Sequence, residues 1–157
     1  MKTIAIVAVL LAAAPAVAKP WQGTEPGQSK REQLLQKFGE PSRVVPAEGK
    51  EILAYLDEKA IKGTKQVQFT VDPNSQVVER ISVFPGPVID KESVESTYGN
   101  ACPSGKAAAS GPCYQKKLTD DFRTYMLYAK LGLAVFLNED GKTVHSLIFT
   151  LQPTGKK

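Results

Sequence analysis

The sequence predicts an α+β fold in which two tandem helix–strand–hairpin repeats form an antiparallel sheet packed by short helices. The first observation is that residues 67–83 and 133–149 align without a gap and carry apolar side chains at alternate positions. Alternation with a period of two is typical of strands that bury one face. The middle of each segment consists of turn-forming residues, DPNS and NEDG, so each segment is expected to be a β-hairpin.

The second observation is a short helix signal upstream of each hairpin. In the first half, Ser29 and Glu32 form a capping box, and Gly39 marks the end of the helix. In the second half, Asp90 is the expected N-cap and Gly99 is the stop. Because a helix of about three turns does not bury its apolar stripe alone, each helix is expected to lie across the sheet.

A further extended segment separates each helix from its hairpin, at residues 51–56 and 122–128. These two segments do not align with each other, so the repeat is supported at both ends of each half and not in its middle. The Pro-Gly-Pro string at residues 85–87 marks the boundary between the halves. The first repeat is therefore expected over residues 29–84 and the second over residues 89–151.

Residues 1–18 have the pattern of a cleavable secretory signal, with a charged start, a short apolar run and a small-x-small site ending at Ala18. The apolar run is too short for a permanent membrane helix, although an anchor or a buried helix is the alternative. The mature chain is expected to start at Lys19, to lack a transmembrane segment and to be periplasmic or secreted. Residues 19–28 are expected to form a mobile leader, and residues 152–157 a tail.

The two cysteines, Cys102 and Cys113, are expected to form a disulfide, since an even number of cysteines close together is typical of exported domains. The loop between them consists mainly of Gly, Pro and small residues and has no core of its own. The alternative, a reactive or metal-binding pair, has no His or acidic residue in the loop to complete a site. No metal or cofactor is expected.

Three short strings resemble the start of the BamE/SmpA outer-membrane assembly domain family: GQSKRE at residues 27–32, LL at 34–35 and FGEP at 38–41. A tandem of such units is similar to the β-lactamase inhibitory proteins, in which Cys102 and Cys113 would match the family's cystine. The resemblance covers residues 27–151 and implies binding of another protein. The chain departs from these patterns because its first half lacks cysteines and because the lipidated Cys of BamE is missing.

Composition and motifs argue against several other functions. The formal net charge is +4 with interspersed charges, so no nucleic-acid partner is expected. The single histidine, His145, has only Thr143 and Ser146 as polar neighbours in sequence, and general acid–base catalysis needs a partner within reach. We therefore expect a non-enzymatic protein, with a hydrolase that uses His145 and an acidic partner as an alternative.

The second hairpin is apolar on both of its faces, and one face is expected to pack against the helix of its own half. The other face, with Ala134, Phe136, Val144 and Ile148, is expected to meet either the rest of the core or a partner protein. Trp21 in the leader is a further binding candidate. These residues lead to the expectation of an exported protein-binding module, acting on an envelope-assembly partner or inhibiting a secreted hydrolase. A structural envelope or coat component is the alternative.

Overall fold

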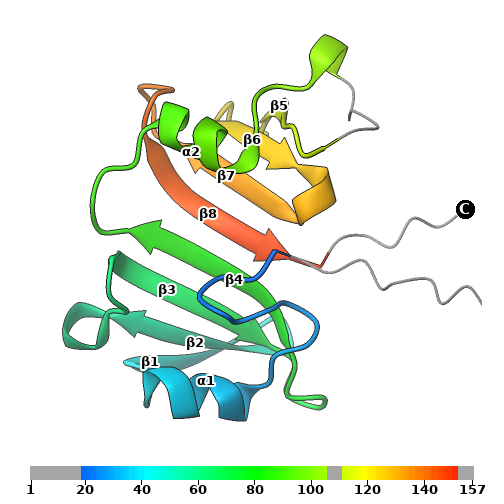
Figure 1. Ribbon diagram of the computed structural model, residues 1–157. Coiled ribbons are helices and arrows are strands. Elements are labelled where there is room, and N and C mark those ends of the chain that lie inside the picture. Colours follow the sequence, from blue (N-terminus) through cyan, green and yellow to red (C-terminus); the bar gives the residue numbers. More distant parts are fainter. Residues whose placement is uncertain (1–18, 106–110, 152–157) are drawn as a thin grey trace, which may run out of the picture.

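The computed structural model describes residues 19–105 and 111–151, so the expected signal peptide, the expected tail and the middle of the cysteine loop lie outside the described residues. Eight antiparallel strands form one sheet in the order β1-β2-β3-β4-β8-β7-β6-β5 (Figure 1). The helices and strands are, in chain order, α1 (Arg31–Phe38), β1 (Arg43–Ala47), β2 (Lys50–Leu56), β3 (Thr64–Val71), β4 (Val78–Pro85), α2 (Lys91–Tyr98), β5 (Gln115–Leu118), β6 (Thr124–Tyr128), β7 (Leu133–Leu137) and β8 (Val144–Thr150). Short 3-10 turns cover Asp57–Lys59, Pro103–Gly105 and Ala129–Leu131.

The predicted arrangement of two tandem helix–strand–hairpin repeats is wrong. The described chain is mostly one continuous eight-stranded sheet with two short helices, and the two expected units do not stand apart within it. Strands β4 and β8 pair directly, with Ile81 opposite Phe149 and Val83 opposite Leu147, so both hairpins share a single ladder. This β4–β8 pairing joins residues that are far apart in sequence, so no local sequence pattern predicts it.

The two edge strands, β1 and β5, were also missing from the prediction. Strand β1 has the sequence RVVPA and is exposed along most of its length. Strand β5 has the sequence QKKL and is likewise mostly exposed. Short strands with Pro or Lys are common at sheet edges, where they discourage further pairing, and they lack the apolar alternation that identifies a strand in sequence.

Both helices lie where the caps placed them, with one detail changed. The Asp90 side chain accepts a hydrogen bond from the Ser93 N–H at 2.7 Å, as expected for an N-cap. At α1 the capping box lies one residue later than expected, because the Gln33 side chain accepts a hydrogen bond from the Lys30 N–H at 2.8 Å. Ser29 instead accepts a hydrogen bond from the Glu25 N–H, which ties the helix start to the leader.

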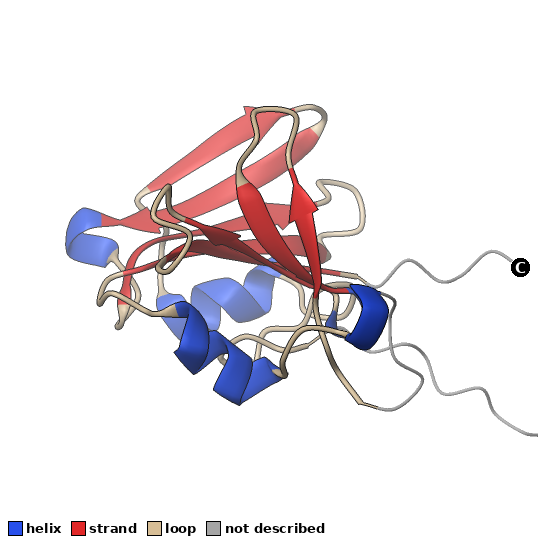
Figure 2. Cartoon of the chain, turned by 90° about the horizontal axis from the view of Figure 1, so that it is seen from above, coloured by secondary structure: helices blue, strands red, loops and turns tan. Residues whose placement is uncertain are grey.

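Both helices cover the same face of the sheet, with Leu34 of α1 and Val94 of α2 buried against it (Figure 2). Every second residue of the central strands points into this helix-side core, as the pleat requires. The largest fully buried side chains are Tyr55, Tyr128, Phe69, Phe149, Leu34, Leu53, Ile81, Met126 and Leu133. Apolar burial on this side accounts for the bulk of the stabilising free energy.

The leader, expected to be mobile, is part of this cover. It lies between α1 and α2 on the helix side of the sheet (Figure 1). The Lys19 N–H donates to the Leu131 carbonyl at 3.1 Å, and the Trp21 ring centroid lies 6.2 Å from that of Phe38 and 6.1 Å from that of Phe69. The leader therefore contacts residues from both halves of the chain and fills the space between the two helices.

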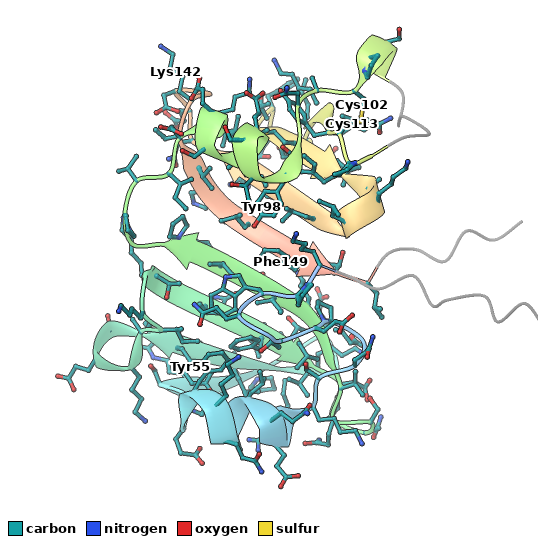
Figure 3. The ribbon with its side chains drawn as sticks, viewed as in Figure 1. Tyr55, Tyr98, Cys102, Cys113, Lys142 and Phe149 are labelled. Atoms are coloured by element: carbon teal, nitrogen blue, oxygen red, sulfur yellow. A yellow bond between two sulfur atoms is a disulfide. The ribbon has the colours of Figure 1, made fainter. Side chains whose placement is uncertain are left out.

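The expected disulfide between Cys102 and Cys113 is confirmed, with a Cα–Cα distance of 4.9 Å (Figure 3). The neighbouring residues Ala101 and Tyr114 form a parallel bridge, and the Cys102 N–H donates to the Tyr114 carbonyl at 2.9 Å. The Tyr114 hydroxyl donates to Glu95 of α2 at 2.6 Å. The disulfide thus holds a short paired segment against the second helix. No helix in the described part of the chain is long and apolar enough to cross a membrane.

Two buried tyrosines tie the sheet to the helix ends. The Tyr55 hydroxyl donates to the Gly39 carbonyl at 2.8 Å, and the Tyr128 hydroxyl donates to the Gly99 carbonyl at 2.7 Å. Burial raises the pKa of Tyr55 to about 12 and raises the pKa of Tyr128 well above its usual range. Both glycines have a positive φ, which side-chain-bearing residues rarely adopt.

Candidate protein-binding face

The face of the sheet opposite the helices, which we call the open face, is covered by no other described element. Because Leu53, Tyr55 and Phe69 point toward the helices, the alternate strand residues point to the open face. Both ends of the sheet bend away from the helices, so the open face is concave (Figure 2). Its large apolar side chains include seven that are partly exposed: Ile52, Leu56, Phe84, Tyr125, Leu127, Phe136 and Ile148. Val45, which pairs with Ile52, is 44 % exposed.

Aromatic rings are concentrated on one side of the open face. Tyr125 on β6 lies directly opposite Phe136 on β7, and the rings stack with centroids 4.9 Å apart and planes 18° from parallel. Across β8, the ring of Phe84 meets that of His145 edge to face, with centroids 5.7 Å apart. Aromatic pairs in such arrangements contribute about 0.5–1.5 kcal/mol beyond the area that they bury, so each ring stabilises the position of its neighbour.

A row in which short and longer side chains alternate runs beside these rings. Ile148 lies between Ala134 on β7 and Ser82 on β4, and Ser82 in turn lies opposite Gln68 on β3. Ala54, opposite Gln68 on the other side, continues the row. Ala54 and Ser82 are almost fully buried although they face outward, because larger neighbours surround them. The open face therefore combines bulky aromatic side chains with a row in which short side chains alternate with Ile148 and Gln68.

The structure brings three of the expected binding residues together. Ala134 lies directly opposite Ile148, and Phe136 is the next outward-facing residue of β7. Val144, the fourth residue of that expectation, is 6 % exposed and belongs to the helix-side core. The reason is a register shift in β8, where Phe136 pairs with Ser146 while Leu137 pairs with Val144. The extra residue turns Val144 inward.

Trp21 also lies away from the other candidates, on the helix side of the sheet. Several open-face residues were not singled out by the sequence, including Phe84, Tyr125 and Leu127. The alternation of Tyr125 and Leu127 with buried Met126 is a strand signal that could have identified two of them. Phe84 could not be found this way, because only the β4–β8 pairing places it beside β8.

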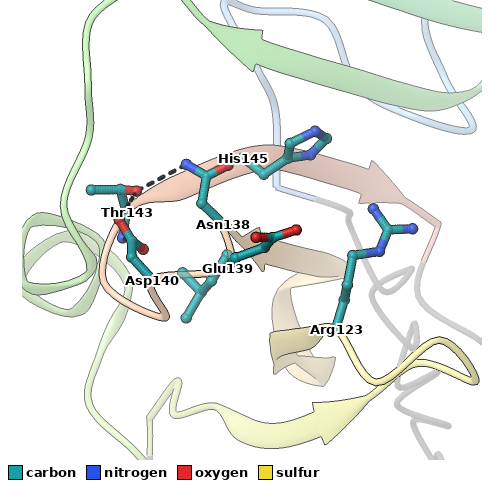
Figure 4. A pocket seen from close by; sticks show the side chains of 7 residues that line it. Arg123, Asn138, Glu139, Asp140, Thr143 and His145 are labelled. Atoms are coloured by element: carbon teal, nitrogen blue, oxygen red, sulfur yellow. Dashed lines mark hydrogen bonds between the residues drawn. The ribbon is translucent and has the colours of Figure 1, made fainter.

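His145 lies at the edge of the open face in a pocket of about 610 Å³ at the end of the β7–β8 hairpin (Figure 4). The pocket is lined by Arg123, Leu137, Asn138, Glu139, Asp140, Thr143 and His145. The His145 Nδ1 atom is 3.2 Å from the Ser146 Oγ, and no hydrogen bond or ion pair joins this ring to a carboxylate among the described residues.

The nearby carboxylate of Asp140 is occupied by its own turn. It accepts hydrogen bonds from the Thr143 hydroxyl at 2.6 Å and from two backbone N–H groups, those of Lys142 and Thr143. The hydrogen bond from the Thr143 side chain is the main cause that lowers the pKa of Asp140. This arrangement builds the hairpin turn, and the hydrogen bonds of the Asp140 carboxylate stay within it. Glu139 is the second carboxylate that lines the pocket.

One aromatic residue outside the strands also faces solvent. Phe122, at the tip of the β5–β6 hairpin, is 84 % exposed and has a φ of 61°, which is unusual for a bulky residue. The tip is held by Thr119, whose Oγ accepts from the Arg123 N–H at 2.9 Å, and by an ion pair of 2.8 Å between Arg123 and Asp121. The hairpin therefore presents an exposed aromatic ring beside Arg123, which lines the His145 pocket.

Comparison with known proteins gives neighbours for the fold. No protein-family model and no curated protein matches the chain. Among solved structures, the chain is similar to YjgB, a DUF4309 family protein from Bacillus subtilis, with a TM-score of 0.53, 16% identity and 83% of each chain covered. It also matches a cysteine-rich secretory protein from Staphylococcus aureus, with a TM-score of 0.44 and 12% identity over 79% of this chain and 44% of that one. The likeness to YjgB shows the fold alone.

Proposed function

We propose that this chain is an exported protein-binding module that holds another protein on its open face. The observation that carries the proposal is the stacked pair of Tyr125 and Phe136 with Ile148 nearby, partly exposed on a concave face that no described element covers. Clustered exposed apolar side chains are uncommon on soluble monomers and mark interaction sites. Aromatic residues supply much of the binding energy at protein interfaces.

The site of action that we propose is the periplasm or the outside of the cell. A disulfide between Cys102 and Cys113 is compatible with an oxidising compartment, and the pattern of residues 1–18 is that of a secretory signal. The family resemblance implies an envelope-assembly partner or a secreted hydrolase to be inhibited. Both partner classes present a folded surface, which suits a concave face.

The test is capture of partners from an envelope extract by the immobilised mature chain and two matched variants. Phe136→Asp places a charge on the open face, while Val44→Asp places one at a helix-side position of β1 that is 46 % exposed. We expect Phe136→Asp to lose the captured protein and Val44→Asp to keep it. Both variants should stay folded, because Val44 is exposed and Phe136 is partly exposed. Phe136→Asp should melt a few degrees below the parent chain, because it loses the stack on Tyr125.

Two outcomes would contradict the proposal. Capture that survives Phe136→Asp would remove the open face from binding. A large fall in melting temperature for Phe136→Asp would mean that this position is core, because burying an unpaired carboxylate costs several kcal/mol.

A further inference from the structure

A second cavity, which we call the α2 pocket, lies between the start of α2, the disulfide segment and the strands β5 to β7. Its volume is about 240 Å³, and it is lined by Lys91, Ala101, Tyr114, Lys116, Thr124, Met126, Leu137 and Gly141. The lining residues on strands β5 to β7 all point to the helix side of the sheet, so none of them belongs to the open face. On β5, Lys116 lines this pocket, whereas Lys117 pairs with Tyr125 of the open face.

The inner wall of the α2 pocket is apolar. Met126 and Leu137 are 1 % and 4 % exposed and belong to the helix-side core, as does the ring of Tyr114. A volume of about 240 Å³ lies just below the range of about 300–1,000 Å³ that is usual for pockets of drug-sized ligands, so the pocket suits a smaller molecule. Apolar walls offer water few hydrogen bonds, so a small apolar group is favoured over water at this inner wall.

The mouth of the pocket is cationic. Lys91 pairs with Glu95 at 3.0 Å and lies 5.9 Å from the centroid of the Tyr114 ring. This ion pair compensates the charges of Lys91 and Glu95, and Glu95 also accepts a hydrogen bond from the Tyr114 hydroxyl at 2.6 Å. Lys116 lies opposite Met126 on the neighbouring strand, is exposed, and forms no ion pair with any described residue. One uncompensated ammonium group therefore stands beside an apolar cavity.

We propose that the α2 pocket binds a small amphiphilic carboxylate, with its hydrocarbon part on Met126 and Leu137 and its carboxylate at Lys116. Apolar walls with one charged group at the rim are the usual make-up of such sites. The disulfide is part of this site, because it holds the segment that carries Ala101 and Tyr114. The inference is independent of the open face, since no open-face side chain contributes to the pocket.

The experiment titrates the mature protein with octanoate, octylamine and acetate by calorimetry. Octanoate carries both the chain and the carboxylate, octylamine reverses the charge, and acetate lacks the chain. We expect octanoate to bind more tightly than either control. Lys116→Gln should weaken octanoate by roughly two- to fivefold, the range of a single exposed charge pair. Lys117→Gln, one residue along the strand and on the opposite face, should leave octanoate binding unchanged.

A pocket-filling variant provides the second arm. Ala101→Phe adds a ring at an exposed position of the pocket wall, so the fold should be retained and octanoate binding abolished. Equal affinity for octylamine and octanoate, or equal losses with Lys116→Gln and Lys117→Gln, would overturn the assignment of the carboxylate to Lys116. Octanoate binding that is unchanged in Ala101→Phe would overturn the pocket itself.

Discussion

At the scale of single residues, the two buried tyrosines make equivalent contacts. Tyr55 and Tyr128 each donate a hydroxyl hydrogen bond to the carbonyl of a glycine that ends a helix. Removing one hydroxyl with Tyr55→Phe or Tyr128→Phe leaves that carbonyl without its partner. We expect each variant to lose about 0.5–1.5 kcal/mol of the free energy of unfolding, measured by urea denaturation. Tyr125→Phe, on the open face, is the control and should change it little.

The same tyrosines set the alkaline limit of stability. The folded state raises the pKa of Tyr55 from 10.0 to about 12, so the folded protein holds this proton more tightly than the unfolded chain does. A raised pKa contributes stability that is complete below the unfolded value and is lost as pH rises toward the folded value. We therefore expect the free energy of unfolding to fall between about pH 10 and 12. The fall should shrink in the double variant Tyr55→Phe with Tyr128→Phe without vanishing, because burial also raises the pKa of Tyr98 and of Tyr114. A fall as large as that of the parent chain would contradict a contribution from Tyr55 and Tyr128.

Trp21 provides a residue-scale test of the leader. Its ring packs on Phe38 and Phe69, so the leader acts as part of the core rather than as a loose arm. Trp21→Ala should cost about 2–3 kcal/mol, less than the 3–5 kcal/mol of a fully buried aromatic, because the ring is partly exposed. Thermal melting measures this. A variant as stable as the parent chain would show that the leader does not close the core in solution.

At the scale of the elements, the disulfide stabilises a local segment. Replacing Cys102 and Cys113 with Ala should lower the free energy of unfolding by roughly 2–3 kcal/mol, the chain-entropy value for a short loop. The sheet pairs outside this loop remain, so the far-ultraviolet circular dichroism of the double variant should match the parent. Octanoate binding should weaken, because the wall of the α2 pocket loses its tether. Full unfolding at room temperature would show that the loop is needed for the whole fold.

The elements also show what the sequence could and could not predict. Caps at Asp90 and Gly99 and the alternation in β3, β4, β7 and β8 are local signals, and the helices and hairpins that they indicate are present. The edge strands carry no such signal, since β1 and β5 bury little. The register shift at His145 has no sequence signal either. Which residue of β8 is left unpaired depends on how β8 aligns with β7, and this alignment is not encoded in β8 alone.

At the scale of the whole molecule, the direct β4–β8 pairing makes one sheet of all eight strands. The leader adds a second link, through the hydrogen bond between Lys19 and Leu131. We expect urea unfolding to be a single cooperative transition, with Trp21 fluorescence and far-ultraviolet circular dichroism following one curve. Two separate transitions would show that the half with strands β1 to β4 and the half with strands β5 to β8 unfold independently.

The open face is also a property of the whole molecule. Phe136 and Ile148 could be predicted from a single hairpin, because they occupy its outward positions. Their neighbours Phe84 and Ser82 come from the other half of the chain, and the concave shape arises from the bending of the full sheet. Sequence alternation places residues on a face, but it does not state which strands meet there.

The most direct test of the open face as a binding surface is site-specific photo-crosslinking in the exported protein. A photoreactive phenylalanine derivative replaces Phe136 on the open face and, in a second variant, Val44 on the helix side of β1. We expect one discrete adduct with another protein from position 136 and none from position 44. Adducts only from position 44, or the same adducts from both positions, would contradict a binding role for the open face.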